Sequence, residues 1–215
     1  MKRWITCSLF GLLTCVHSLS AANQTDTVSP VHIKNHLPFN ITIKLADFML
    51  PNGLHSGATG VCDGKWLFIA GRTNGMHTFN IAPDNFPPQQ QNKVVYVVDP
   101  KTQKVYSRSL TQKKSGLTQS QIDYLSVTAP QFYQSGDTLY MTGGYGVNSA
   151  TGLFTTKPIL TAIDMKGLIA WVKHETSHKA SHFIRQISKS IFKVTGGYMT
   201  QIAKGPTLLV FGQSF

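Results

Sequence analysis

The stretch GDTLYMTG at residues 136–143 sets the organisation of this chain, because its template occurs three times. The other copies are GKWLFIAG at residues 64–71 and GPTLLVFG at residues 205–212. Each copy has a glycine at both ends and a mostly apolar run between them, which is typical of a buried β-strand bounded by turns. The copies follow one another at intervals of about 70 residues, and such regular self-similarity indicates a repeat protein.

Around each copy the sequence predicts strands in a constant order. A short strand rich in small residues precedes the glycine-bounded strand, and an apolar strand that ends at an aspartate and a polar outer strand follow it. The predicted repeats are residues 55–110, 125–172 and 192–215, of which the third is incomplete. Their strands are 55–62, 64–71, 94–98 and 104–110, then 125–132, 138–142, 159–164 and 168–172, then the strand within 205–212.

The two links between the repeats are predicted to contain short helices. Thr118 and Gln121 have the spacing of a capping box, which starts a helix that carries Ile122 and Leu125. The second link, residues 173–190, places Phe183, Ile184 and Ile187 near helical spacing.

Four strands per unit, with a strand ending in Gly-Gly and a later Trp, resemble the kelch β-propeller family. The resemblance rests on residues 139–144 (LYMTGG), Asp164 and Trp171, with counterparts at residues 68–71, Asp99 and Tyr106. Residues 71–75 (GRTNG) and 194–199 (VTGGYM) are similar to exported bacterial kelch-like proteins. The resemblance implies an all-β fold of four-stranded antiparallel propeller blades and implies export, but no particular reaction.

The predicted blades do not complete a propeller. Closure needs about four to eight blades, and these residues encode a little over two. We expect the sequence to be the N-terminal part of a longer product or the product of a truncated gene. Closure by self-association is the alternative, because an open end exposes strand edges.

The N-terminus has the pattern of an export signal. Lys2 and Arg3 precede a short apolar run, and small residues follow up to Ala22, which predicts a signal peptide over residues 1–22. The apolar run is shorter than the roughly 20 residues that a membrane span requires, so no span is expected after cleavage. Residues 23–54 are predicted to be a lead-in with one strand at 39–45. The mature protein would be periplasmic, on the cell surface or extracellular.

Charge and cysteine content limit the classes of function. The formal net charge is +11, but the basic residues are scattered and no nucleic-acid recognition motif accompanies them, so no nucleic-acid partner is predicted. Cys7 and Cys15 leave with the signal peptide, so Cys62 remains alone and no internal disulfide can form. It is predicted to be a small buried apolar residue.

The sharpest chemical motif is HETSH at residues 174–178. On a helix, His174 and His178 would share a face and bind zinc, with Glu175 as a base. Polar neighbours and a position between two repeats disfavour this arrangement, so neither a metal nor another cofactor is predicted.

The candidate ligand-binding residues follow the glycine-bounded strands of the first two repeats. Loops after equivalent propeller strands emerge on one face, and loops on a rigid scaffold commonly carry binding residues. The candidates are Arg72, Asn74, His77, Tyr145 and Asn148. The alternative is that Arg72 and Asn74 only shape a turn.

These features predict an exported binding or scaffold module, with a glycan or a surface protein as its partner. The alternative is a propeller enzyme that acts on sugars, such as an epimerase or mutarotase, with His and Arg transferring protons. A zinc hydrolase using His174 and His178 ranks last. Few carboxylates lie near the predicted loops, which favours binding over catalysis.

Overall fold

The computed structural model describes residues 39–76 and 85–215. The chain divides into two units, Met1–Leu45 and Ala46–Phe215, and only residues 39–45 of the first unit are described. They are exposed and form no strand, so the strand predicted there is wrong. No strand among the described residues pairs with them, and a strand requires such a hydrogen-bonded partner. Among the described residues, no helix is long and apolar enough to cross a membrane.

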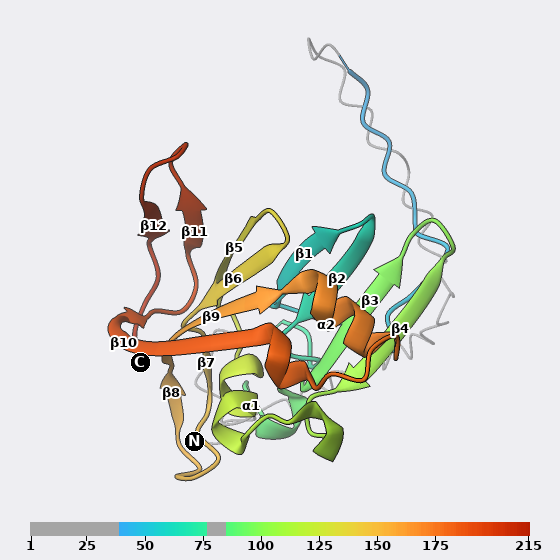
Figure 1. The fold of residues 1–215 in the computed structure, drawn as a ribbon. Coiled ribbons are helices and arrows are strands. Elements are labelled where there is room, and N and C mark those ends of the chain that lie inside the picture. The colour runs from blue at the N-terminus through green and yellow to red at the C-terminus, as the bar shows by residue number, and fades with distance from the viewer. Residues whose placement is uncertain (1–38, 77–84) are drawn as a thin grey trace, which may run out of the picture. The chain divides into compact units, whose positions relative to one another are not determined.

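The second unit begins with a four-stranded antiparallel sheet whose strands are adjacent in chain order (Figure 1). Turns separate β1 from β2 and β3 from β4. The apolar strand β3 lies inside the sheet and is mostly buried. A short 3-10 helix, η1 (Pro88–Gln90), precedes β3. The strands are β1 (Ala58–Cys62), β2 (Lys65–Ile69), β3 (Val94–Asp99) and β4 (Lys104–Ser109). The four strands predicted for the first repeat are confirmed.

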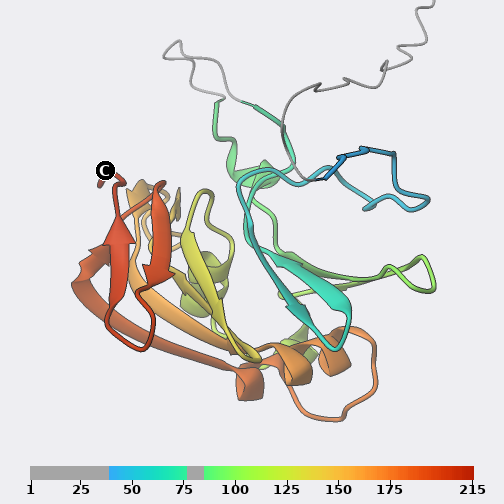
Figure 2. The same cartoon turned by 90° about the horizontal axis from the view of Figure 1, so that it is seen from above.

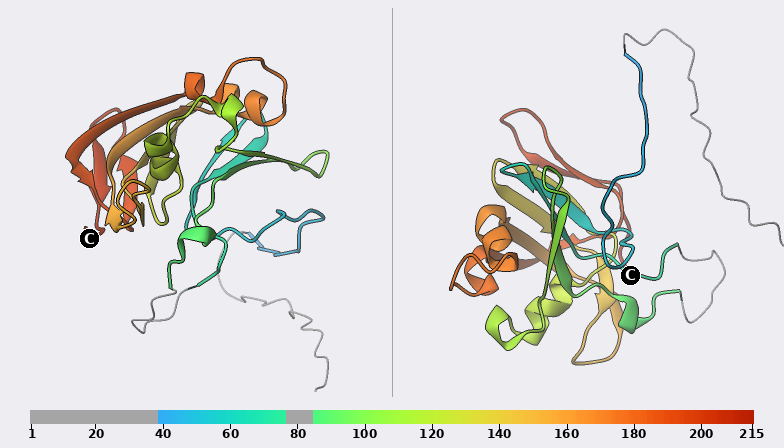
Figure 3. Two further views of the ribbon diagram at one scale, coloured as in Figure 1. Left: turned by 90° about the horizontal axis from the view of Figure 1, so that it is seen from below. Right: turned by 90° about the vertical axis from the view of Figure 1, so that its right-hand side faces the viewer.

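A second four-stranded antiparallel sheet has the order β5-β6-β9-β10. Figure 3 shows β10, the longest strand, along one edge of this sheet. A separate hairpin, β7–β8, lies between β6 and β9 in the chain. The strands are β5 (Gln131–Ser135), β6 (Thr138–Thr142), β7 (Tyr145–Val147), β8 (Phe154–Thr156), β9 (Pro158–Asp164) and β10 (Ile184–Lys193).

The third repeat forms the hairpin of β11 (Tyr198–Gln201) and β12 (Thr207–Val210). In Figure 2 this hairpin, β5–β6 and β1–β2 lie side by side in that order. The described residues are therefore mostly β, in antiparallel sheets, and neither four-stranded sheet closes on itself. The predicted all-β class is confirmed.

The helix in the first link is confirmed. Helix α1 (Gln119–Leu125) follows the 3-10 helix η2 (Lys113–Ser115). The Thr118 side chain accepts from the Gln121 backbone N–H, and the Gln121 side chain accepts from the Thr118 N–H at 2.9 Å. Because this helix continues to Leu125, β5 begins only at Gln131, later than the predicted strand 125–132.

The prediction of an outer strand at residues 168–172 is wrong. This segment belongs to helix α2 (Met165–Val172), whose N-terminus is capped by the Asp164 side chain accepting from Gly167 N–H at 3.2 Å. Met165, Leu168 and Val172 are all buried, and their spacing is helical. A five-residue apolar run fits a strand or a helix equally well. The Asp164 cap at its N-terminal side favours the helix.

The second link is also different from its prediction. Residues 173–190 contain a loop, the 3-10 helix η3 (Ala180–Phe183) and the first part of β10, rather than an α-helix. β10 supplies the outer strand of the second sheet, pairing with β9 from Ile184 opposite Ile163. Much of β10 is exposed, so its sequence lacks the apolar alternation of a half-buried strand.

One hydrophobic core joins the first two sheets through α2. The helix contacts β1 and β3 of the first sheet and β9 of the second, and β1 also contacts β5. Trp171 and Leu168 of α2 are fully buried, together with Leu67 of β2 and Leu139 of β6. The repeats are therefore packed on one another as well as similar in sequence.

Candidate ligand-binding site

The three repeats place equivalent residues next to one another at one end of their strands. The residue after the glycine or glycine pair that ends each copy, at positions 72, 145 and 213, forms an isolated antiparallel bridge with a residue before the first strand of its own repeat. In the second copy that pair is Gly143–Gly144. The three bridges are His55 with Arg72, Thr128 with Tyr145, and Thr195 with Gln213.

Backbone hydrogen bonds connect each repeat to the next in a repeated pattern. Gly71 N–H donates to Val127 O, and Gly144 N–H donates to Val194 O, both at 2.7 Å. A second series joins the residues beside the bridges: Ala129 N–H donates to Ser56 O at 2.8 Å, and Gly196 N–H donates to Ala129 O at 2.7 Å. The backbone thus holds the three bridges in register, independently of side-chain identity.

An open cavity of about 370 Å³ lies where the bridges meet. All three bridge pairs line it, and the additional lining residues are Ser56, Phe86, Ala129 and Phe215. Its volume falls in the range of small-molecule sites.

Among the described residues that line this cavity, Arg72 is the one with a Lys, Arg, Asp or Glu side chain. Its side chain is 3 % exposed, and its guanidinium lies 4.8 Å from the centre of the Phe86 ring. Nη1 donates to Asn85 O at 3.4 Å, and Nη2 lies 3.3 Å from His55 Nδ1. Because an arginine only donates, His55 Nδ1 is the acceptor of that contact. Burial lowers the pKa of the Arg72 guanidinium from its usual high value.

Aromatic rings form an apolar wall beside Arg72. The Tyr145 ring stacks on Phe154 with a centroid separation of 5.5 Å and makes edge contacts with Phe86 and Phe215. Tyr145 opens the hairpin β7–β8, and its backbone is held by the bridge to Thr128. A flat apolar surface and a buried cation therefore share one cavity.

The predicted site residues fall into different environments. Arg72 and Tyr145 both line the cavity. Asn74 lines the small adjoining pocket with Arg72, and its Nδ2 donates to Asn85 O at 3.2 Å. Asn148 is in the β7–β8 turn, where its side chain accepts from Ala150 N–H at 3.0 Å. His77 lies outside the described residues.

Sequence reasoning missed several cavity residues. The unpredicted members of the three bridges are His55, Thr128, Thr195 and Gln213. Phe215, also unpredicted, contributes to the aromatic wall. Gln213 could have been found from the repeat alignment, because it follows the glycine of the third copy as Arg72 follows that of the first. His55 and Thr195 carried no local signal, since their pairing is long-range.

The residues of the HETSH motif do not form the helix that a zincin arrangement requires. Helix α2 ends at Val172, and His174 has a φ of 61°, which leaves the helical conformation. Glu175 is ion-paired with Lys173, and the His178 and His182 rings lie 5.0 Å apart. Within residues 39–76 and 85–215, no three His, Cys, Asp or Glu side chains form a group suited to a metal ion.

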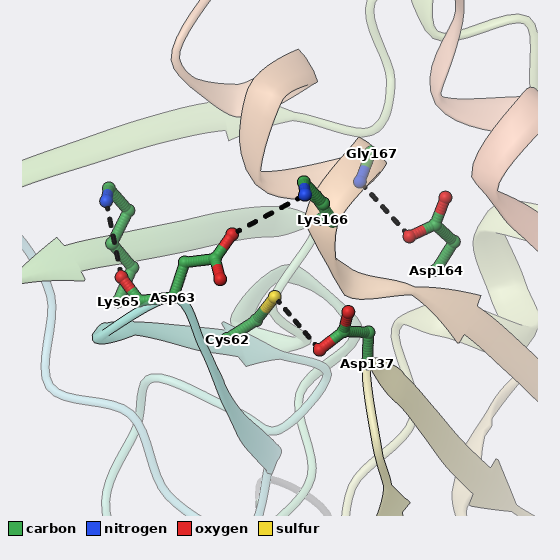
Figure 4. A network of polar contacts seen from close by, with 7 residues as sticks. All are labelled: Cys62, Asp63, Lys65, Asp137, Asp164, Lys166 and Gly167. Carbon is green, nitrogen blue, oxygen red and sulfur yellow. Dashed lines mark hydrogen bonds and ion pairs between the residues drawn. The ribbon is translucent and has the colours of Figure 1, made fainter.

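A polar cluster connects the β1–β2 turn, the β5–β6 turn and the start of α2 (Figure 4). The Cys62 thiol donates to Asp137 Oδ1 at 3.5 Å, and Lys166 lies 4.0 Å from Asp63. Both members of this ion pair are largely exposed, so it contributes little stability. Burial, followed by the Asp137 carboxylate, raises the pKa of the Cys62 thiol to about 11. This cluster connects the first two repeats, and the raised pKa of Cys62 disfavours its thiolate.

Cys62 is therefore expected to resist alkylation in the folded protein. At pH 8, iodoacetamide should label it about 100-fold more slowly than in urea, because a raised pKa reduces the thiolate fraction. Peptide mass spectrometry of timed, quenched samples measures this ratio, and equal labelling in both states would contradict it. The raised pKa stabilises the fold below pH 9, and this contribution is lost as the pH rises through about 11.

No family model, curated protein or solved structure matches this chain. The fold and the cavity define it as a mostly β protein with antiparallel four-stranded sheets and a ligand-sized cavity where the three bridges meet. Function must therefore be argued from the cavity itself.

Proposed function

We propose that the chain is an exported binding or scaffold module whose partner, a glycan or a surface protein, binds at the cavity formed by the three bridges. The observation that carries the proposal is the convergence of equivalent residues from three repeats on one cavity. A scaffold that repeats its backbone while varying the residue at each equivalent position, here Arg72, Tyr145 and Gln213, is suited to recognition.

We further propose that the sheets are blades of a kelch-type β-propeller. The two four-stranded sheets have the same strand order, and the hairpin β11–β12 corresponds to the first two strands of a third blade. The backbone bonds from Gly71 to Val127 and from Gly144 to Val194 repeat the same contact between consecutive units. A repeated contact of this kind is what arranges blades around a central axis.

The residues around the cavity favour binding over proton transfer. Its described lining contains one histidine and one arginine but no Glu or Asp side chain, so it holds no acid and base pair of the Glu or Asp type. His55 Nδ1 already accepts from Arg72, and Ser56 Oγ lies 2.7 Å from the same nitrogen. The aromatic wall around Tyr145 suits stacking on the apolar face of a sugar ring.

Replacing Tyr145 tests the proposed site. On a glycan array and on immobilised surface protein, Tyr145→Ala should weaken binding about 30-fold, because a central aromatic anchor contributes about 2 kcal/mol. Tyr198→Ala is the matched control, since Tyr198 is 61 % exposed on β11 and does not line the cavity. Binding that survives Tyr145→Ala, or the absence of any glycan or protein partner, would refute the proposal.

Export is part of the same proposal and has its own test. After expression of the full chain in a bacterium with a general secretion pathway, the exported protein should begin at Asn23, because small residues precede it. N-terminal sequencing of the exported fraction checks this. Retention of the uncleaved chain in the cytoplasm would contradict it.

A further inference from the structure

Among the described residues, no acidic side chain pairs with the buried guanidinium of Arg72. An arginine has five N–H donors, and the described residues provide acceptors for one donor on Nη1 and one on Nη2. Nε is buried, and no described residue accepts a hydrogen bond from it. Both ion pairs found among the described residues involve other side chains. A buried cation with unsatisfied donors is costly unless an anion joins it.

The surroundings of Arg72 keep this charge in place. Phe86 covers one face of the guanidinium, and His55 Nδ1 and Asn85 O orient its edge. The guanidinium geometry matches a carboxylate, which can accept two parallel N–H bonds. The Tyr145 ring belongs to the same cavity, and its stacking partner Phe154 orients it. The cavity therefore offers a cation and an aromatic ring side by side.

We propose that this cavity binds a carboxylate carried on a ring with an apolar face, with Arg72 holding the carboxylate and Tyr145 contacting the ring. The inference rests on the proposed function and narrows its ligand to one chemical class. Two sources share this chemistry, sugar acids and aromatic acids. The hydroxyl groups of Thr128 and Thr195 in the cavity wall are compatible with ring hydroxyls. The Thr195 hydroxyl already donates to Ala129 O at 3.1 Å, so its oxygen is left to act as an acceptor.

Calorimetric titration of the full chain with matched acid and neutral compounds tests the proposal. D-glucuronate is compared with D-glucose, and benzoate with benzyl alcohol. At least one acid should bind about 10- to 100-fold more tightly than its neutral counterpart, because a charge-assisted hydrogen bond contributes 1.5–3 kcal/mol. Tighter binding of D-glucuronate than of D-glucose would identify sugar acids as the ligand class. Tighter binding of benzoate than of benzyl alcohol would identify aromatic acids. Equal affinities in both pairs would overturn the proposal.

Substitutions of arginine test whether the preference for the acid depends on Arg72. Arg72→Gln should remove it, whereas Arg185→Gln, which removes the same charge from an exposed position on β10, should leave it intact. Loss in both variants, or in neither, would overturn the proposal. Arg72→Lys retains the positive charge but not the two parallel N–H donors of the guanidinium, so weaker binding of the acid is expected. If Arg72→Gln does not fold, an unchanged acid affinity in Arg72→Lys would overturn the proposal.

The two proposals can fail separately. One outcome is that a neutral glycan binds, that Tyr145→Ala weakens its binding, and that neither acid is preferred over its neutral counterpart. The proposed binding site is then correct and the proposed carboxylate ligand is wrong. If no array ligand is affected by Tyr145→Ala, the proposed site itself is wrong.

Discussion

Gly143→Ala is expected to destabilise the protein severely, by about 4 kcal/mol or more. Gly143 has a φ of +66°, and a Cβ built there would lie 1.7 Å from the backbone oxygen of Val194. That oxygen accepts the hydrogen bond from Gly144 N–H that joins the second repeat to the third. The obstacle is backbone, so relief of the clash requires the third repeat to move. Urea unfolding followed by circular dichroism measures the loss.

Gly136→Ala is the matched control for this substitution. Gly136 also has a positive φ, +56°, but its Cβ would meet nothing within 4 Å. It should cost only the strain of a left-handed conformation, about 1–2 kcal/mol. Equal losses in the two variants would show that the close approach of Val194 to Gly143 does not matter.

Trp171→Ala is expected to cost about 3–5 kcal/mol of unfolding free energy. Trp171 is fully buried on α2, and the Arg108 guanidinium of β4 lies 4.3 Å from the centre of its ring. Arg108 Nη1 also donates to Trp171 O at 2.5 Å. Truncation therefore leaves a cavity in the core between the first two sheets and removes the ring that covers a buried cation. Thermal unfolding and urea titration both report the loss.

Trp66→Ala is the control for Trp171→Ala, because it removes the same type of side chain from a less buried position. Trp66 lies on β2, is 36 % exposed and makes an edge contact with Phe48 at 5.9 Å. Its truncation leaves an opening to solvent rather than a closed cavity, so a loss of about 2 kcal/mol or less is expected. A loss as large as that of Trp171→Ala would mean that the first sheet depends on the Phe48 contact.

The parts of the fold that were predicted correctly depend on local signals. Strands β2, β6 and β12 are apolar runs bounded by turn residues, and α1 begins at the capping box of Thr118 and Gln121. The errors fall where local signals are ambiguous or absent. Residues 168–172 fit two periodicities, and β10 is exposed along most of its length.

The candidate site was predicted only in part, because only some of its residues have a local signal in the sequence. Arg72 follows Gly71 and Tyr145 follows the pair Gly143–Gly144, so their similar position after the repeated strand could be deduced from the sequence. Their sharing of a cavity with His55, Thr195 and Gln213 could not, because the bridges join residues that are far apart in the chain. The lack of a described carboxylate partner for the buried Arg72 was likewise invisible in the sequence.

By itself the sequence determined the repeat, the mostly β class and the strands whose ends are marked by glycine, because these follow from the period of apolar residues and from backbone freedom at turns. Only the tertiary structure decided that α2 is a helix in the core and that β10 completes the second sheet. It also decided which residues face one another across the cavity. Those outcomes depend on long-range packing and hydrogen bonds, which no stretch of a few residues encodes.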